Sequence, residues 1–285
     1  MCFIMNNFKL LLASICLASF ASCAGDGAEE VPAVTPTEEV VATPEPEHPA
    51  GELISEKNGL KLTTVVGSPD FPEATLKITN PVEGAKLKTG NTTFVYEVSN
   101  YELGTQTSSE HVHCANSDKG QHIHLILNNE PYTAHYTPQF DLEVPDGNYV
   151  ALSFLSRSYH ESIKNGTASQ LIQFTVGKAK SEKIDLTKPM MFYSRPKGEY
   201  KGPKETDKLL LDFFLSNVTL AEDGYKVRAT INGTDFLITK WQSMFIEGLP
   251  LGDVTIKLEL LDKDGNLVKA PYNPVERTVK LMAAE

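Results

Sequence analysis

The chain has 285 residues, of which 41% are hydrophobic, and a formal net charge of −11 from 26 basic and 37 acidic side chains. That length is enough for two ordinary domains. Residues 24–56 hold nine acidic groups and no Lys or Arg, whereas residues 57–285 hold 25 basic and 28 acidic groups and carry only −3. A nearly neutral body without a basic stripe excludes nucleic acid as a partner.

Residues 1–22 have the pattern of an export signal, in which Lys9 precedes an apolar run over 10–20 and small residues follow. The run is too short to span a bilayer as a helix. Small residues directly before Cys23 resemble the bacterial lipoprotein signal, and this resemblance implies that Cys23 is lipidated and ties the protein to a membrane. An ordinary cleaved signal peptide is the alternative.

Residues 23–56 form the second segment, which is rich in Pro, Glu, Val, Thr and Ala. It has neither a helical nor a strand period and cannot bury a core. We therefore expect a disordered acidic tether between the anchor and the folded body.

The body contains an internal repeat, because four segments recur in the same order. Residues 98–103, 122–128, 140–147 and 149–155 match 215–220, 226–232, 245–252 and 254–260, respectively. The repeat predicts two copies of one domain, at 57–178 and 189–285. One cysteine in the body cannot build a disulfide framework, so each copy must be held by its core.

Each copy reads as a series of short strands with a period of two residues and no long helical pattern. In the first copy they are predicted at 93–98, 122–127, 140–144, 149–155 and 171–176, led by 60–66 and 74–78. Asp146-Gly147, Asn232-Gly233 and Asp264-Gly265 mark tight turns. Such spacing over about 100 residues predicts an all-β fold of two tandem immunoglobulin-like sandwiches.

The two copies differ by an insertion. Eighteen residues separate Leu103 from His122, but only five separate the matching Leu220 from Lys226, so the first copy has thirteen extra residues. A long loop without its own structure is commonly functional. The insertion holds three candidate metal ligands, namely His111, His113 and Cys114.

Three more features place further histidines beside this insertion. Alternation puts His122 and His124 on one face of their strand. A two-residue turn at 129–130 would set His135 directly opposite His124. His160 follows the antiparallel neighbour of that strand and would lie near its start. These histidines and the insertion would lie together at one end of the first sandwich, which we call the histidine rim. Neutral imidazoles and a thiolate suit copper or zinc, so we predict a transition-metal site at this rim.

Other readings of the rim stay open. The second copy has Lys226, Arg228 and Lys240 where the first has histidines, as a solvated sheet face would. Arg157 and Lys164, near His160, could instead hold an anion such as phosphate or sulfate, or they belong to an ordinary charged loop.

The run Gly-Gln-His-Ile-His-Leu-Ile-Leu-Asn-Asn, followed by Pro-Tyr, resembles secreted bacterial domains with a His-x-His strand in immunoglobulin-like or cupredoxin-like sandwiches. The Ser-Arg-Ser-Tyr-His-Glu-Ser loop resembles one found in lipoproteins of Bacteroidota. The likeness covers about 85 residues and implies a lipoprotein on the periplasmic or outer face of the outer membrane. Some similar proteins are described as phosphopeptide-binding.

These observations predict a membrane-anchored binding lipoprotein whose first domain binds a metal or a small ligand at the histidine rim. An anion-binding, phosphopeptide-binding or structural surface protein is the alternative. A metal-dependent enzyme is a further one, with Glu161 as the nearest candidate base. No hydrolase motif is present, and we assign no catalytic residue.

Overall fold

The computed structural model describes residues 51–109, 111 and 114–284. The predicted leader, Cys23, most of the tether and His113 therefore lie outside the described residues. Residues 47–285 form one compact unit. None of the helices in the described part of the chain is long and apolar enough to cross a membrane.

The first sandwich is built from eight strands: β3 (Thr75–Asn80), β4 (Lys86–Leu87), β5 (Gly90–Ser99), β6 (His122–Leu127), β7 (Thr133–His135), β8 (Gln139–Val144), β9 (Gly147–Ser156) and β10 (Ser169–Val176). One sheet has the order β4-β10-β9-β6-β7 and the other has the order β3-β5-β8. All neighbouring strands are antiparallel except β4 and β10, which pair in parallel, and two such layers in this order make an immunoglobulin-like sandwich.

The second sandwich repeats this plan with β11 (Met190–Arg195), β12 (Glu199–Lys201), β13 (Lys208–Ser216), β14 (Lys226–Ile231), β15 (Thr234–Ile238), β16 (Met244–Glu247), β17 (Gly252–Leu261) and β18 (Val275–Met282). A short helix, α1 (Pro203–Thr206), precedes β13. One sheet has the order β12-β18-β17-β14-β15, which matches the larger sheet of the first sandwich. The predicted all-β fold of two sandwiches is confirmed.

The strand register also repeats between the two sandwiches. His122 of β6 lies opposite Ser156 of β9, and the matching Lys226 of β14 lies opposite Leu261 of β17. His124 and Arg228 therefore occupy the same place in the two sandwiches. The sequence repeat is thus a repeat of structure.

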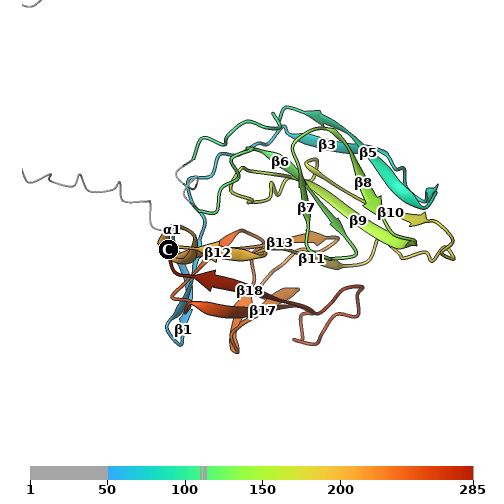
Figure 1. Cartoon of the computed structure of the whole chain (residues 1–285). Helices are drawn as coiled ribbons and strands as arrows, with labels where there is room; N and C mark the ends of the chain where they lie inside the picture. Colours follow the sequence, from blue (N-terminus) through green and yellow to red (C-terminus); the bar gives the residue numbers. More distant parts are fainter. Residues whose placement is uncertain (1–50, 110, 112–113, 285) are drawn as a thin grey trace, which may run out of the picture. The chain divides into compact units, whose positions relative to one another are not determined.

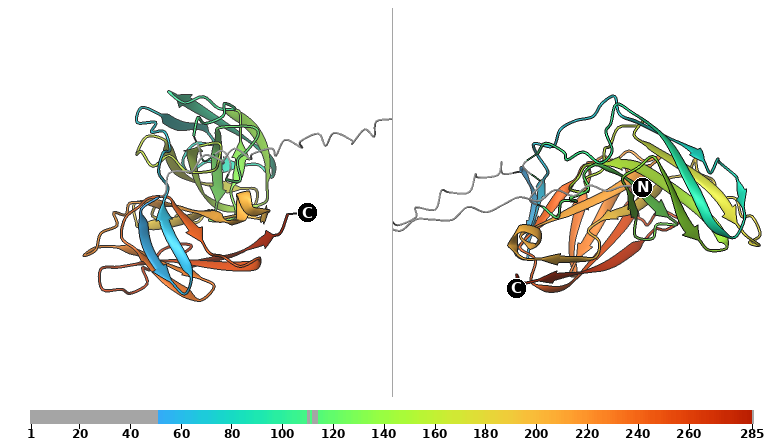
Figure 2. Two further views of the ribbon diagram at one scale, coloured as in Figure 1. Left: turned by 90° about the vertical axis from the view of Figure 1, so that its left-hand side faces the viewer. Right: turned by 45° about the horizontal axis from the view of Figure 1, so that its top comes forward.

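The leading hairpin does not belong to the first sandwich. β1 (Leu53–Lys57) pairs with β2 (Leu60–Thr64), and β2 pairs with β16 in the sheet β1-β2-β16-β13-β11. The blue hairpin in Figure 2 accordingly lies beside the orange strands of the second sandwich. The prediction that residues 60–66 lead the first sandwich is wrong. Leu62 is fully buried in the second core, and burial there decides where the hairpin packs.

A third core joins the two sandwiches. Ile126, Leu152 and Phe154 of the first pack with Phe192 and Phe214 of the second. The intervening residues of β6 and β9 face the first sandwich's own core. Both faces of this sheet are therefore covered, and strands that are buried on both faces have nearly continuous apolar sequences. His122 and His124 share the face of Ile126 because side chains alternate along a strand.

Candidate metal centre

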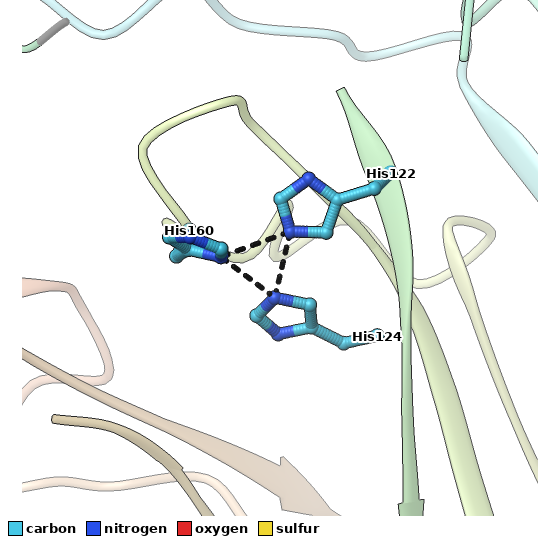
Figure 3. Close-up of side chains that lie close together, drawn as sticks. All are labelled: His122, His124 and His160. Atoms are coloured by element: carbon cyan, nitrogen blue, oxygen red, sulfur yellow. Dashed lines mark hydrogen bonds between the residues drawn. The ribbon is translucent and has the colours of Figure 1, made fainter. Parts of the chain in front are cut away.

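Strand β6 and the turn that follows its neighbour β9 carry the three histidines of the centre. His122 and His124 project from one face of β6. β9 ends at Ser156, opposite His122, and the chain then turns so that the amide of His160 donates to Arg157 O at 2.9 Å. His160 itself is in the left-handed region, with φ 68°. This turn brings the third imidazole beside the strand that carries the other two (Figure 3).

Three nitrogen atoms, one from each imidazole ring, lie close together in a triangle (Figure 3). The Nε2 atoms of His122 and His124 are 2.9 Å apart, and Nδ1 of His160 lies 3.0 Å from the first and 3.3 Å from the second. Nitrogens that each lie 2.0–2.1 Å from a tetrahedral zinc ion are about 3.3–3.4 Å apart. The triangle therefore needs only a small expansion to coordinate such an ion.

Hydrogen bonds outside the triangle orient the rings. Nδ1 of His122 lies 2.8 Å from the carbonyl oxygen of Gly120, which can only accept. In the neutral ring Nε2 then carries the lone pair, and it faces the triangle. Nδ1 of His124 lies 3.4 Å from Oγ of Ser194. Metal-binding histidines commonly use the second ring nitrogen in this way.

Burial keeps these histidines neutral. The His122 and His124 side chains are 0% exposed. Loss of solvation lowers the pKa of His122 to about 4, and it holds the pKa of His124 and of His160 well below the usual value. Nearby positive charge from Arg195 adds to each of these pKa shifts. All three rings therefore present uncharged imidazole at neutral pH, which is the form that binds metals.

A tyrosine and two cations flank the triangle on the side of the second sandwich. The Tyr132 ring stacks on His124 with ring centroids 3.6 Å apart, and its hydroxyl lies 3.2 Å from His160 Nδ1. Arg195 Nη1 donates to this hydroxyl at 3.1 Å. Lys197 Nζ donates to the Tyr132 carbonyl oxygen at 2.6 Å and lies 4.4 Å from the ring centroid.

The insertion covers the centre from the other side. Its Ser117 forms a hydrogen bond of 2.7 Å with the Tyr136 hydroxyl, and the Tyr136 ring lies 5.1 Å from that of His122. The Ser117 amide also donates to Ser158 O in the His160 turn. Ala115 packs against the second core. The insertion thus contacts both sandwiches, next to the turn that carries His160 and next to the Tyr136 ring beside His122.

The predicted role of His135 is not supported, because the hairpin register is displaced by one residue. Ile123, not His124, lies opposite His135. Asn128 and Asn129 both have positive φ, and the amide of Glu130 donates to Leu127 O at 2.9 Å, so the two-residue turn lies one position earlier than predicted. That change alone would displace the register by two residues, but one extra residue between Glu130 and Thr133 reduces the displacement to one. A slip of one residue moves a side chain to the other face. His135 stacks on Phe140 there, with ring centroids 3.3 Å apart.

The other described candidate ligands of the insertion, His111 and Cys114, are not part of the triangle. His111 hydrogen-bonds through Nε2 to Val66 O and packs on the Phe245 ring of β16. Cys114 is half-buried and unpaired. Burial raises the pKa of its thiol, and Lys208 of β13 opposes this. Neither residue joins the group of three histidines whose ligand atoms lie within 4.8 Å of one another.

The proposed anion ligands are already engaged within the protein. Arg157 donates twice to Pro69 O, at 2.7 and 3.1 Å, and pairs with Glu161 at 3.3 Å. Lys164 forms an ion pair with the fully buried Asp212 of β13. Both cations have their hydrogen bonds satisfied internally, so this geometry does not favour an anion site. Glu161, the candidate base, is likewise held by Arg157.

Sequence reasoning missed the groups around the triangle. Tyr132, Ser194, Arg195 and Lys197 come from two sandwiches and approach one another only through the packing between them. One signal was present in the sequence: Arg195 ends a strand, Met-Met-Phe-Tyr-Ser-Arg, that is otherwise nearly apolar. A cation in such a strand indicates a buried polar contact.

No family model matches the sequence, and no curated protein matches it. Among solved structures 115 chains match. They include the fibronectin(III)-like modules of Clostridium thermocellum CbhA, with 14% identity, a TM-score of 0.27, and coverage of 74% of this chain and 95% of that one. The SGBP-B of the Bacteroides ovatus mixed-linkage glucan utilization locus has 13% identity, a TM-score of 0.22 and coverage of 73% and 47%. A two-domain fibronectin type-III segment of chicken tenascin has 11% identity, a TM-score of 0.18 and coverage of 73% and 98%. These likenesses concern the fold alone.

Proposed function

We propose that the first sandwich binds a transition-metal ion, copper or zinc, through His122, His124 and His160. The triangle of ring nitrogens, 2.9–3.3 Å apart, carries the proposal. Burial supports it, because His122 and His124 are 0% exposed, His160 is partly buried, and each of the three uncharged imidazoles contributes a nitrogen to one point. Copper and zinc are the ions that such ligands suit.

Burial also favours the metal site over the solvated-face alternative. Lys226 and Arg228, which take the equivalent places in β14, are partly exposed, and Arg228 pairs with Glu259 at 2.7 Å. His122 and His124 are 0% exposed at the same register. A hydrolytic enzyme is less well supported, since within the described residues no acidic side chain joins the histidine group.

The proposal includes a membrane anchor. A lipid on Cys23 would hold the body at the outer membrane through the acidic tether, on its periplasmic or outer face. Because each buried CH₂ of a lipid chain contributes about 0.8 kcal/mol, the chains would dominate membrane affinity. The second sandwich would then support the centre, with Ser194, Arg195 and Lys197 beside the ligands.

Elemental analysis of the purified protein tests the metal proposal. We expect about one copper or zinc ion per chain after loading and removal of excess ion. The variant His122→Asn/His160→Asn should lose it, because Asn removes the ligand nitrogen, retains a donor for Gly120 O and tolerates positive φ at position 160. The matched control His135→Asn should keep full metal content. Equal metal content in all three proteins would refute the site.

A further inference from the structure

The centre has an unusual charge balance for a cation site. Its ligands are three neutral rings, and the rings packed on them belong to Tyr132, Tyr136 and Phe154. In the part of the chain that the structure describes, no Asp, Glu or Cys joins the group. Nothing anionic in that group would offset the charge of a bound ion.

The charged groups nearest to the centre are cations. Arg195 touches the Tyr132 hydroxyl, which is 3.2 Å from His160 Nδ1, and Lys197 lies over the Tyr132 ring that stacks on His124. Each cation is therefore separated from the ligand nitrogens by a single side chain. Among the described residues neither forms an ion pair within 4.0 Å, and Arg195 is only 5% exposed with its Nε unpartnered.

Two buried carboxylates need to be considered, and both are already neutralised. Glu161, which follows His160 in the chain, pairs with Arg157 at 3.3 Å, and Asp212 pairs with Lys164. Asp212 attracts Arg195 electrostatically. However, its Oδ1 accepts from Lys164 and from Ser243, the latter at 3.0 Å. The charges of Glu161 and Arg157 cancel. The formal charges of the other side chains add up to a positive value, since Asp212 carries one negative charge and Lys164, Arg195 and Lys197 each carry one positive charge. The electrostatic potential at the triangle is therefore positive.

Such a field opposes a bound ion in proportion to the charge of that ion. In a buried place the interaction is poorly screened, and a divalent ion meets twice the repulsion of a monovalent one. We propose that the centre selects cuprous copper over divalent zinc, and that Arg195 and Lys197 impose this selectivity. The inference rests on the metal site proposed above and specifies its ion.

The test compares the affinities of Cu(I) and Zn²⁺ for the full protein and for Lys197→Met, by competition with a chelator of each ion and without oxygen for Cu(I). Methionine keeps the apolar stem of Lys197 and removes its charge. We expect the Cu(I) affinity to rise roughly threefold and the Zn²⁺ affinity roughly tenfold, because the logarithm of the change scales with ion charge. Lys197→Glu should enlarge the changes in both affinities and keep the ratio of their logarithms.

Lys88→Met is the matched control. Lys88 is exposed and follows β4, whose Leu87 lies opposite Val176 beside the Gly147 end of β9, at the far end of the sheet from Ser156. It should leave both affinities unchanged. Wild-type protein that binds Zn²⁺ more tightly than Cu(I), or equal changes for the two ions in Lys197→Met, would overturn the selectivity. A protein that binds neither ion would instead refute the metal site itself.

Discussion

At the scale of single residues, burial sets the pH range over which the centre can work. Sequence alone predicts that metal affinity falls near pH 6.5, where an ordinary imidazole takes up a proton. In the fold the pKa of His122 is lowered to about 4 and those of His124 and His160 are well below normal, chiefly by desolvation. Protons would therefore compete with a bound metal ion only in more acidic solution.

We predict that metal affinity changes less than about threefold between pH 7.5 and 5.5 and falls steeply only as the pH approaches 4. Chelator competition across this range measures it. The sign follows from the direction of the shifts: a lowered pKa delays protonation of the ligand. A loss of tenfold or more between pH 7.5 and 6 would show that the rings are solvated.

Some residues of the centre were predictable from the sequence and others were not. Alternation along β6 correctly paired His122 with His124, and the antiparallel neighbour correctly brought His160 to them. Tyr132 and Arg195 were not predictable, because their contacts depend on how the two sandwiches pack. No short-range pattern encodes that packing.

At the scale of elements, β6 and β14 show that one register can serve opposite environments. The paired positions are equivalent, yet in β6 this face lies under Tyr132 and the third core, whereas in β14 it meets solvent. The one-residue displacement of the β6–β7 hairpin has another origin. The turn lies at Asn128-Asn129, and one extra residue between Glu130 and Thr133 then sets the register. Alternation along β6 does not encode that extra residue.

This difference predicts the outcome of exchanging residues between the copies. The double change His122→Lys and His124→Arg mimics β14, and sequence comparison alone suggests that the fold would tolerate it. In the structure it would bury two charges beside Arg195 without a partner, a change that costs several kcal/mol. We expect a strongly lowered melting temperature. The reverse change in β14, Lys226→His and Arg228→His, should alter it little.

At the scale of the whole molecule, the two sandwiches share more than a linker. The β1–β2 hairpin contributes Leu60 and Leu62 to the second core, and the third core covers one face of each sandwich. The sequence repeat predicted two sandwiches, and the fold has them. It could not show that a hairpin lying before the first copy completes the second, because pairing between distant strands leaves no local trace.

A fragment of residues 189–285 is therefore expected to fold poorly, although the repeat alone suggests an independent domain. It lacks two buried leucines, each contributing about 1.5–3 kcal/mol, and it exposes Phe192 and Phe214 of the third core. Circular dichroism during urea unfolding measures this. Residues 47–285 should unfold cooperatively, and the fragment at much lower urea. A fragment as stable as the longer chain would contradict the shared core.

The placement of the β1–β2 hairpin has a topological consequence. Residues 53–64 and 189–284 build one sandwich, and the other is spliced between them, so the chain passes from one to the other twice, once on each side of the inserted body. A protease that cuts a single crossing would leave the two halves covalently joined through the other. Only two cuts, one before β3 and one after β10, would free the first sandwich from both segments of the second.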